Sequence, residues 1–239
     1  MAITASYQVS ADGLAARGMP RDATAGVLRR SVTVAQQARD SFEGGRQRWM
    51  AASVGPYGAA LADGSEYHGD YGLTVEALRA WHRPRLEVLL DAGADLLALE
   101  TIPCLAEAQA LLEEFRGAGV PCWLSLTCEA DRTRRGEPLR EAFAMAADAP
   151  EVIAVGVNCC AATGVVGTVA LAHHVSGKPV VCYPNSGELW DATARGWAGP
   201  LTFHPADAPA WVAAGARLVG GCCRVGPDEI RAVAAAIAP

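Results

Sequence analysis

The sequence has little positive charge. It contains a single lysine, Lys178, and its 26 acidic residues outnumber the 20 lysine and arginine residues, so the net charge is −6. We find no basic stripe and no arginine cluster, which argues against nucleic acid as a partner. No apolar run reaches the ~18 residues that a membrane helix needs, and residues 1–7 lack the basic and apolar parts of a signal peptide. We therefore expect a cytoplasmic protein that binds small molecules and neither nucleic acid nor membranes.

Familiar cysteine spacings are also missing. The chain has eight cysteines but neither a CxxC nor an HExxH pattern. Several cysteines, such as Cys122, Cys128 and Cys182, lie in apolar, strand-like runs. Without an export signal, buried free thiols and metal ligands fit this distribution better than disulfides do.

What the sequence does contain is a repeat of short apolar runs separated by helical stretches. Of its 239 residues, 51% are hydrophobic and 19% charged, which is typical of a globular chain with a large core. The runs are apolar on both faces, as in a parallel sheet covered by helices. The strand-like runs are Ala2–Tyr7, Ala51–Val54, Asp95–Glu100, Cys122–Thr127, Val152–Asn158, Pro179–Tyr183 and Arg217–Gly221.

Amphipathic patterns predict the helices between these runs. They cover residues 21–42, 75–92, 105–116 and 137–147, and a last helix opens with Pro227, a favoured first helical residue. Alternating strands and helices of this spacing predict an α/β fold, a (β/α)8 TIM-type barrel. The sequence supplies seven strands where a closed barrel needs eight, so either one strand is misread or the first β/α unit is missing. No linker-like segment divides the chain, and we expect a single domain over residues 1–239.

Cysteines follow two of the strands at the end where barrel enzymes build their sites. Cys159 and Cys160 come directly after Asn158, and Cys222 and Cys223 come directly after Gly221. Three thiolates can hold a tetrahedral zinc ion and leave one position open for a substrate, as catalytic zinc sites do. Neighbouring residues on a strand point to opposite faces, so Cys222 and Cys223 can ligate together only if the strand has ended before them. The alternative is that these cysteines are small core residues.

Thiolate-rich zinc would favour one kind of chemistry. Zinc binds a thiol substrate as the thiolate at neutral pH, and three cysteinate ligands keep that sulfur electron-rich. Such a site suits alkyl transfer onto sulfur better than hydrolysis, which needs a more electrophilic metal.

Several segments resemble the homocysteine S-methyltransferase family. Gly156-Val-Asn-Cys159 and Gly220-Gly-Cys-Cys-Arg224 are similar to its zinc motifs. Other segments resemble the branch that uses S-methylmethionine or S-adenosylmethionine, and the likeness extends from Ala2 to about Ile230. These segments are Ala2–Gln8, Ser53–Tyr67, Leu99–Pro103 and Tyr183–Glu188.

The resemblance implies roles for individual residues. Zinc would be held by Cys159, Cys222 and Cys223, with the homocysteine sulfur in the fourth position. Cys160 would then be a spare thiol, able to substitute, bridge or oxidise.

The remaining roles concern the substrates. Glu100 would bind the homocysteine ammonium, Asn158 would brace the site by hydrogen bonding, and Thr4 would contact the amino acid. Each has an ordinary alternative, namely a solvated carboxylate at a strand end, a turn residue and a β-branched strand residue. The loops Gly55–Tyr67 and Tyr183–Glu188 would shape the methyl-donor side.

One departure from the family is clear. The family's barrel begins with an additional β/α unit whose strand ends in an Asp-Gly motif that helps to bind homocysteine. Here Asp-Gly occurs only at Asp12-Gly13 and Asp63-Gly64, neither in the matching place. We therefore expect the 1–239 domain to be N-terminally incomplete, with the natural protein starting upstream. The two sheet edges left open would encourage association, such as a homo-oligomer.

The resulting hypothesis is methyl transfer from a sulfonium donor to zinc-bound homocysteine, giving methionine. S-methylmethionine is the favoured donor, S-adenosylmethionine is the alternative, and betaine is less favoured. One rival is a metal-free barrel lyase or aldolase with a Schiff-base lysine, but Lys178 precedes a strand instead of following one. The other rival is a catalytically impaired zinc- or thiol-binding remnant of the same family.

Overall fold

Seven parallel strands form one curled sheet. The computed structural model describes residues 1–45, 47–191 and 196–238. The strand order is β1-β2-β3-β4-β7-β8-β11, and every neighbouring pair is parallel. The strands are β1 (Ala2–Ile3), β2 (Met50–Val54), β3 (Leu96–Ile102), β4 (Cys122–Leu126), β7 (Val152–Asn158), β8 (Val180–Tyr183) and β11 (Ala216–Val219).

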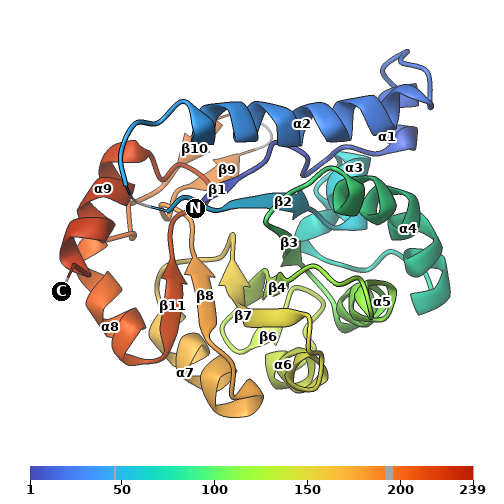
Figure 1. Cartoon of the computed structure of the whole chain (residues 1–239). Coiled ribbons are helices and arrows are strands. Elements are labelled where there is room, and N and C mark those ends of the chain that lie inside the picture. The colour runs from blue at the N-terminus through green and yellow to red at the C-terminus, as the bar shows by residue number, and fades with distance from the viewer. Residues whose placement is uncertain (46, 192–195, 239) are drawn as a thin grey trace.

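Helices surround the outer face of this sheet (Figure 1). The α-helices are α1 (Ala11–Ala15), α2 (Ala23–Asp40), α3 (Tyr57–Leu61), α4 (Val75–Asp91), α5 (Leu105–Phe115), α6 (Leu139–Ala147), α7 (Val165–Ser176), α8 (Ala208–Ala213) and α9 (Pro227–Ala236). The smaller elements are the 3-10 helices η1 (Ser65–Tyr67) and η2 (Pro205–Asp207) and the hairpins β5–β6 (Cys128–Glu129, Arg132–Thr133) and β9–β10 (Leu189–Asp191, Gly196–Ala198). The sequence predicted this alternation because each strand is apolar on both faces and each long helix on one.

The core lies on both sides of the sheet. A large cluster joins the strands to the surrounding helices, with Leu28, Leu89, Leu111 and Phe143 fully or almost fully buried. A smaller cluster lines the inner face of the curl and contains Trp123, Val181 and Tyr183. Small residues let the strands pack closely, and Gly156 of β7 is the extreme case, because a Cβ there would lie 1.8 Å from the carbonyl oxygen of Val181.

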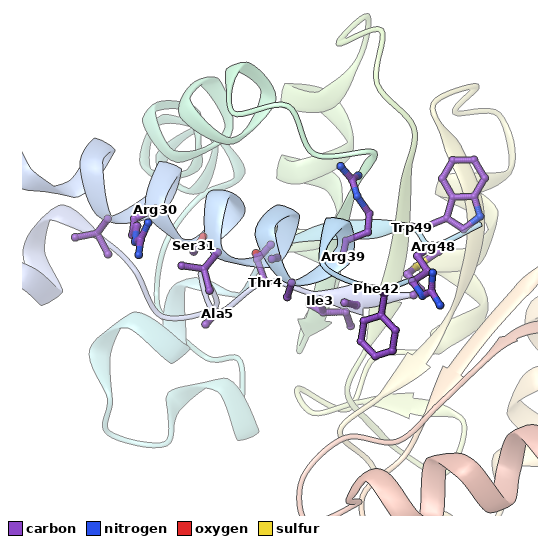
Figure 2. A pocket seen from close by; sticks show the side chains of 15 residues that line it. Ile3, Thr4, Ala5, Arg30, Ser31, Arg39, Phe42, Arg48 and Trp49 are labelled. Carbon is purple, nitrogen blue, oxygen red and sulfur yellow. The ribbon is translucent and has the colours of Figure 1, made fainter. Parts of the chain in front are cut away.

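The curled sheet does not close among the described residues. β1 pairs only with β2, and β11 pairs only with β8. A groove runs beside β1 and under α2, and the side chains of Ile3, Phe42 and Trp49 line it (Figure 2). These three side chains are all exposed. The prediction of a barrel-type α/β fold with seven strands is therefore confirmed.

The first strand is shorter than the sequence suggested. The run Ala2–Tyr7 was expected to be a strand throughout, but β1 stops at Ile3 and residues 5–8 form turns. The hydroxyl of Thr4 accepts a hydrogen bond from the backbone N–H of Ser53 at 3.0 Å and pairs with the hydroxyl of Ser6 at 2.8 Å. These side-chain bonds replace ladder bonds and turn the chain across the carboxyl end of β2.

Lys178 lies at the opposite end of the sheet from Cys159, Cys222 and Cys223. Its ammonium donates to the carbonyl oxygens of Ala149 and Val152 at 2.9 and 2.8 Å, where β7 begins. This position explains the lone lysine as a structural residue and removes it as a Schiff-base candidate. In the described part of the chain, no helix has the length and apolar character needed to cross a membrane.

Candidate functional site

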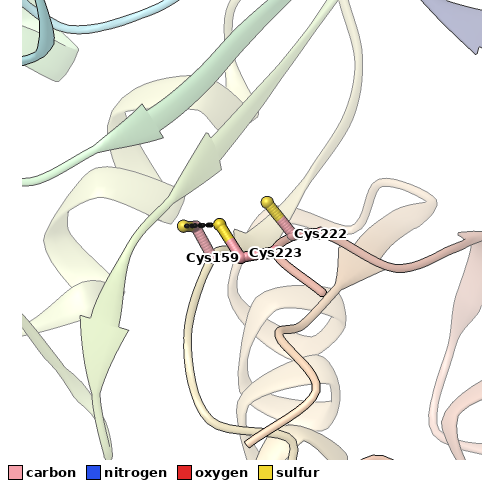
Figure 3. Close-up of side chains that lie close together, drawn as sticks. All are labelled: Cys159, Cys222 and Cys223. Carbon is pink, nitrogen blue, oxygen red and sulfur yellow. Dashed lines mark hydrogen bonds between the residues drawn. The ribbon is translucent and has the colours of Figure 1, made fainter. Parts of the chain in front are cut away.

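Three cysteine sulfurs converge at the carboxyl ends of β7 and β11. The Sγ atoms of Cys159, Cys222 and Cys223 all lie within 4.8 Å of one another. Cys159 and Cys223 are the pair joined in Figure 3, at 3.6 Å. The cysteines that the sequence singled out from two distant segments are therefore brought together, at the end of the sheet where barrel enzymes carry their sites.

The chain turns sharply at Cys159 to present its thiol. The residue has φ = 51°, in the left-handed region that a side chain rarely adopts. Two hydrogen bonds hold this peptide, because the Cys159 N–H donates to the carbonyl oxygen of Tyr183 at 3.2 Å and its own carbonyl accepts from Thr127 Oγ1 at 3.0 Å. Such backbone strain persists where the surroundings fix it, and it is common at functional sites.

The other two cysteines follow a strand that has already ended. β11 stops at Val219, so Cys222 and Cys223 lie in a turn and can point to the same side. The Cys222 N–H donates to the carbonyl oxygen of Pro184 at 2.8 Å, and the Cys223 N–H donates to Asn185 Oδ1 at 3.1 Å. Gly221 is required for close packing and not for an unusual φ. A Cβ on Gly221 would lie 2.2 Å from the side chain of Val225.

The electrostatics of the cluster favour a cation. Hydrogen bonds from Cys159 and Cys222 lower the pKa of the Cys223 thiol below its ordinary value. Hydrogen bonding to Cys159 and Cys223, followed by burial, raises the pKa of Cys222. One thiolate is thus stabilised by two thiols, and full ionisation of the cluster requires a positive charge among the sulfurs. An all-sulfur set with three donors fits zinc and leaves a fourth tetrahedral position.

Cys160 takes no part in this cluster. It is buried in the large hydrophobic core and shares a hydrogen bond with Cys128. Of the two adjacent cysteines, only Cys159 thus lies with Cys222 and Cys223, as the motif implied.

Glu100 lies near the carboxyl end of β3 and is 6% exposed. Ser53 Oγ donates to its Oε1, and Tyr183 Oη donates to its Oε2 at 2.9 Å. Burial raises the pKa of this carboxyl despite these two bonds. A buried carboxylate beside the thiols would be stabilised by a bound cation, which an amino-acid ammonium would provide.

The side chain of Asn158 is fully buried and links β7 to β3 and β4 by hydrogen bonds. Its Oδ1 accepts from the backbone N–H of Thr101 and from Ser125 Oγ, both at 2.8 Å, and its Nδ2 donates to Thr101 Oγ1 at 2.7 Å. Thr101, directly after Glu100, has φ = 61°. The hydrogen bonds with Asn158 therefore hold a second residue in the left-handed region. Thr4 is also buried, and its hydroxyl already bonds Ser6 and Ser53, as described above.

Sequence reasoning missed the tyrosines that surround the sulfurs. Tyr67 Oη lies 4.0 Å from Cys159 Sγ. Tyr7 contacts Thr101 by a side-chain hydrogen bond, and burial, followed by the charge of Cys159, raises the pKa of its phenol. Tyr7 was expected to end a strand, and Tyr67 lies in the loop expected to shape the methyl-donor side, but composition alone singles out neither residue.

A buried arginine links the two loops that carry these tyrosines. The guanidinium of Arg85, on α4, donates to the carbonyl oxygens of Gly55 and Tyr7, each at 3.1 Å. It is 3% exposed and stacks over the ring of Trp81, with 4.6 Å between guanidinium carbon and ring centroid. The arginine therefore positions the segments after β1 and β2 relative to each other.

Comparisons with known proteins agree with this geometry. The family model described as homocysteine S-methyltransferase matches residues 1–237. The homocysteine S-methyltransferase of Escherichia coli K12 is 45% identical over 98% of the chain and 78% of its own length, and homocysteine S-methyltransferase 4 of Zea mays is 45% identical over 98% and 74%. The crystal structure of the E. coli homocysteine methyltransferase MmuM in its metallated form superposes with a TM-score of 0.85 at 42% identity, over 98% of this chain and 78% of that one.

Proposed function

Because the chain belongs to the homocysteine S-methyltransferase family, we propose that it transfers a methyl group from a sulfonium donor to the sulfur of homocysteine, giving methionine. The observation that carries the proposal is the convergence of Cys159, Cys222 and Cys223 within 4.8 Å of one another. Three thiolates on two strand ends would hold a zinc ion and leave room for one more sulfur.

Zinc supplies the chemistry that the side chains lack. When bound, it would hold the homocysteine sulfur as a thiolate at neutral pH and so remove the need for a general base. A bound metal is supported by this cluster of three cysteines together with the existence of a metallated form of the E. coli relative. The identity of the metal as zinc rests on the all-sulfur ligand set.

The chain's own residues would bind and orient the amino acid. Glu100 is the candidate for the homocysteine ammonium, because its carboxylate is buried and its neighbours Ser53 and Tyr183 are neutral donors. Asn158 would keep Glu100 in place by fixing the Thr101 turn. Thr4 reaches Glu100 only through Ser53, so its contact with substrate stays a prediction.

The transfer itself needs alignment more than proton transfer. The bond between the methyl carbon and the donor sulfur breaks as the bond to the homocysteine sulfur forms, and the electron pair stays on the departing sulfur. The leaving thioether is neutral, so no general acid is required. The protein would hold the three atoms in line and exclude water, with Tyr7 and Tyr67 beside the sulfurs.

We propose S-methylmethionine as the preferred donor, with S-adenosylmethionine as the alternative. The basis is the likeness of the Ser53–Tyr67 and Tyr183–Glu188 loops to that branch of the family. A cytoplasmic location and a single homocysteine-binding domain over residues 1–239 also stay proposals.

One assay with metal analysis tests the function. The purified protein, loaded with zinc, is supplied with homocysteine and either S-methylmethionine or S-adenosylmethionine, and methionine formation is measured. We expect turnover with at least one donor and about one zinc per chain. Bound zinc without turnover of either donor would favour a catalytically impaired zinc-binding remnant of the family. Turnover without zinc would contradict the proposed site.

A further inference from the structure

Glu66 carries a buried carboxylate oxygen without a partner. The residue lies in η1, directly before Tyr67, and is only 9% exposed. Its Oε2 is buried and accepts no hydrogen bond from the described residues. Leaving a carboxylate oxygen unpaired and out of water is costly, and buried polar atoms are nearly always paired. Glu100, the other buried acid of the site, has both oxygens hydrogen-bonded.

Neighbouring residues place this carboxylate beside the cysteine cluster. The hydroxyl of Tyr67, the next residue, lies 4.0 Å from Cys159 Sγ. The negative charge of Glu66 also contributes to the raised pKa values of Tyr7 and Tyr67, after burial and the charge of Cys159. Glu66 therefore lies close enough to the two tyrosines for its charge to act on both, and its neighbour Tyr67 reaches Cys159.

Two contacts fix the backbone of η1, which carries Glu66. Gly58 of α3 packs against it so closely that a Cβ would lie 2.5 Å from the Glu66 backbone nitrogen. Asp63 Oδ1 accepts from the Ser65 N–H at 2.9 Å and fixes the turn before it. The carboxylate is thus held on a rigid support, as a binding group should be.

We propose that Glu66 binds the positively charged sulfonium centre of the methyl donor. This inference rests on the proposed function, which supplies a cationic donor, and assigns Glu66 to the donor side while Glu100 takes the homocysteine ammonium. A sulfonium offers no N–H or O–H, so it is recognised by charge alone, which suits an oxygen without a hydrogen-bond donor. After transfer the donor sulfur is neutral, so the attraction disappears and the product thioether can leave.

The position of the charge dictates which kinetic constant responds. Positive charge on the donor sulfur is largest in the bound donor and falls as the methyl group departs. Glu66 therefore stabilises the bound donor more than the transition state, and its removal should raise the KM for the donor without lowering kcat in proportion. A merely structural role would lower kcat and stability together.

Binding of a cation and a matched neutral ligand tests the assignment. S-methylmethionine and methionine share the amino-acid part and differ in the charge on sulfur. Calorimetric titration would compare wild type, Glu66→Gln, the charge-retaining Glu66→Asp and, as control, Glu87→Gln at an exposed acid of α4. We expect Glu66→Gln to weaken S-methylmethionine binding about tenfold or more, to leave methionine binding unchanged, and Glu66→Asp to keep most of the preference for the cation.

Several results would overturn the inference. If Glu66→Gln weakened the binding of S-methylmethionine and of methionine equally, Glu66 would contact the amino-acid part that the two ligands share. If it raised only the KM for homocysteine, Glu66 would serve the other substrate. Unchanged binding of S-methylmethionine by a folded Glu66→Gln protein would leave the carboxylate without a role in donor binding. If Glu66→Gln does not fold, loss of the preference for S-methylmethionine over methionine in Glu66→Asp, which keeps the charge, would contradict recognition by charge. The wild-type protein could bind S-methylmethionine through its charge and yet form no methionine. That result would contradict the proposed function but would still support the role of Glu66.

Discussion

Cys159 Sγ and Cys223 Sγ lie 3.6 Å apart although 64 positions separate them in the chain. β8 lies between the two strands that deliver them, and its last residue and the segment directly after it bond to both. Tyr183 accepts from the Cys159 N–H, and the side chain of Asn185 accepts from the Cys223 N–H. The distance between the sulfurs is therefore fixed by three neighbouring strand ends and does not depend on a flexible loop.

Replacing one clustered cysteine should abolish metal binding. In Cys223→Ala two sulfurs remain, too few for the three-thiolate site, so bound zinc should fall from about one per chain to a small fraction. Cys122→Ala is the control, since Cys122 is also a free cysteine but lies buried in the core cluster and outside the group of three sulfurs. Metal content after dialysis measures both, and zinc retained by Cys223→Ala would contradict the assignment.

Substituting Glu100 should affect homocysteine and spare the metal. In Glu100→Gln the amide keeps the size of the side chain but cannot neutralise an ammonium, so the affinity for homocysteine should fall about tenfold or more. Zinc content and the KM for the methyl donor should stay near their wild-type values. Steady-state kinetics with each substrate varied in turn give the answer, and an unchanged KM for homocysteine would remove the proposed role.

Two glycine-to-alanine changes should have opposite effects on stability. Gly156→Ala places a methyl group 1.8 Å from the Val181 carbonyl oxygen, so the free energy of unfolding should fall by more than about 3 kcal/mol, or the protein should not fold. Gly167→Ala lies on the exposed face of α7 with nothing within 4 Å, and should gain about 0.5–1 kcal/mol from lower chain entropy. Denaturant unfolding separates the two, and a tolerated Gly156→Ala would contradict the close packing of β7 on β8.

Acid should destabilise the fold partly through Glu114. Hydrogen bonds from Arg83 and Arg79 lower its pKa from 4.5 to about 2. Between these two values the unfolded chain binds the proton and the folded chain does not, so this contribution is complete above pH 4.5 and is lost as pH falls towards 2. Glu114→Gln should cost about 1 kcal/mol at neutral pH.

The same variant should also be less sensitive to acid. Its unfolding free energy should change less than that of wild type when the pH is lowered from neutral, while Glu87→Gln, at an exposed position, should follow wild type. Parallel pH profiles for Glu114→Gln and wild type would show that this ion pair contributes nothing.

The sequence predicted the elements whose signal is local. The helices expected at 75–92 and 105–116 became α4 and α5 with ends within one residue, because an apolar stripe defines each of them and Thr74 caps the start of α4. Cysteines that follow two strands at the active end of a barrel suggested a metal site, and the likeness to the family's motifs then implied Cys159, Cys222 and Cys223 as its ligands. The length of β1 was wrong, since the side-chain bonds of Thr4 that end it come from residues far along the chain.

Other parts of the site lay beyond sequence reasoning for a physical reason. Glu66 lies in a loop that the family likeness assigned to the donor side, and Tyr7 was expected in a strand, but neither was singled out because their roles come from burial and from neighbours in other segments. Arg85 reads as a charged helix residue, yet it is 3% exposed and holds the Gly55 and Tyr7 carbonyls. Such roles depend on packing between segments, which periodicity does not encode.

X-ray absorption at the zinc edge tests the central claim most directly, because it counts the sulfur atoms around the metal. The zinc-loaded protein should show three sulfur neighbours at about 2.3 Å and one lighter atom. Addition of homocysteine should raise the count to four sulfurs. Fewer than three sulfurs in the free protein, or a count that homocysteine leaves unchanged, would contradict the account.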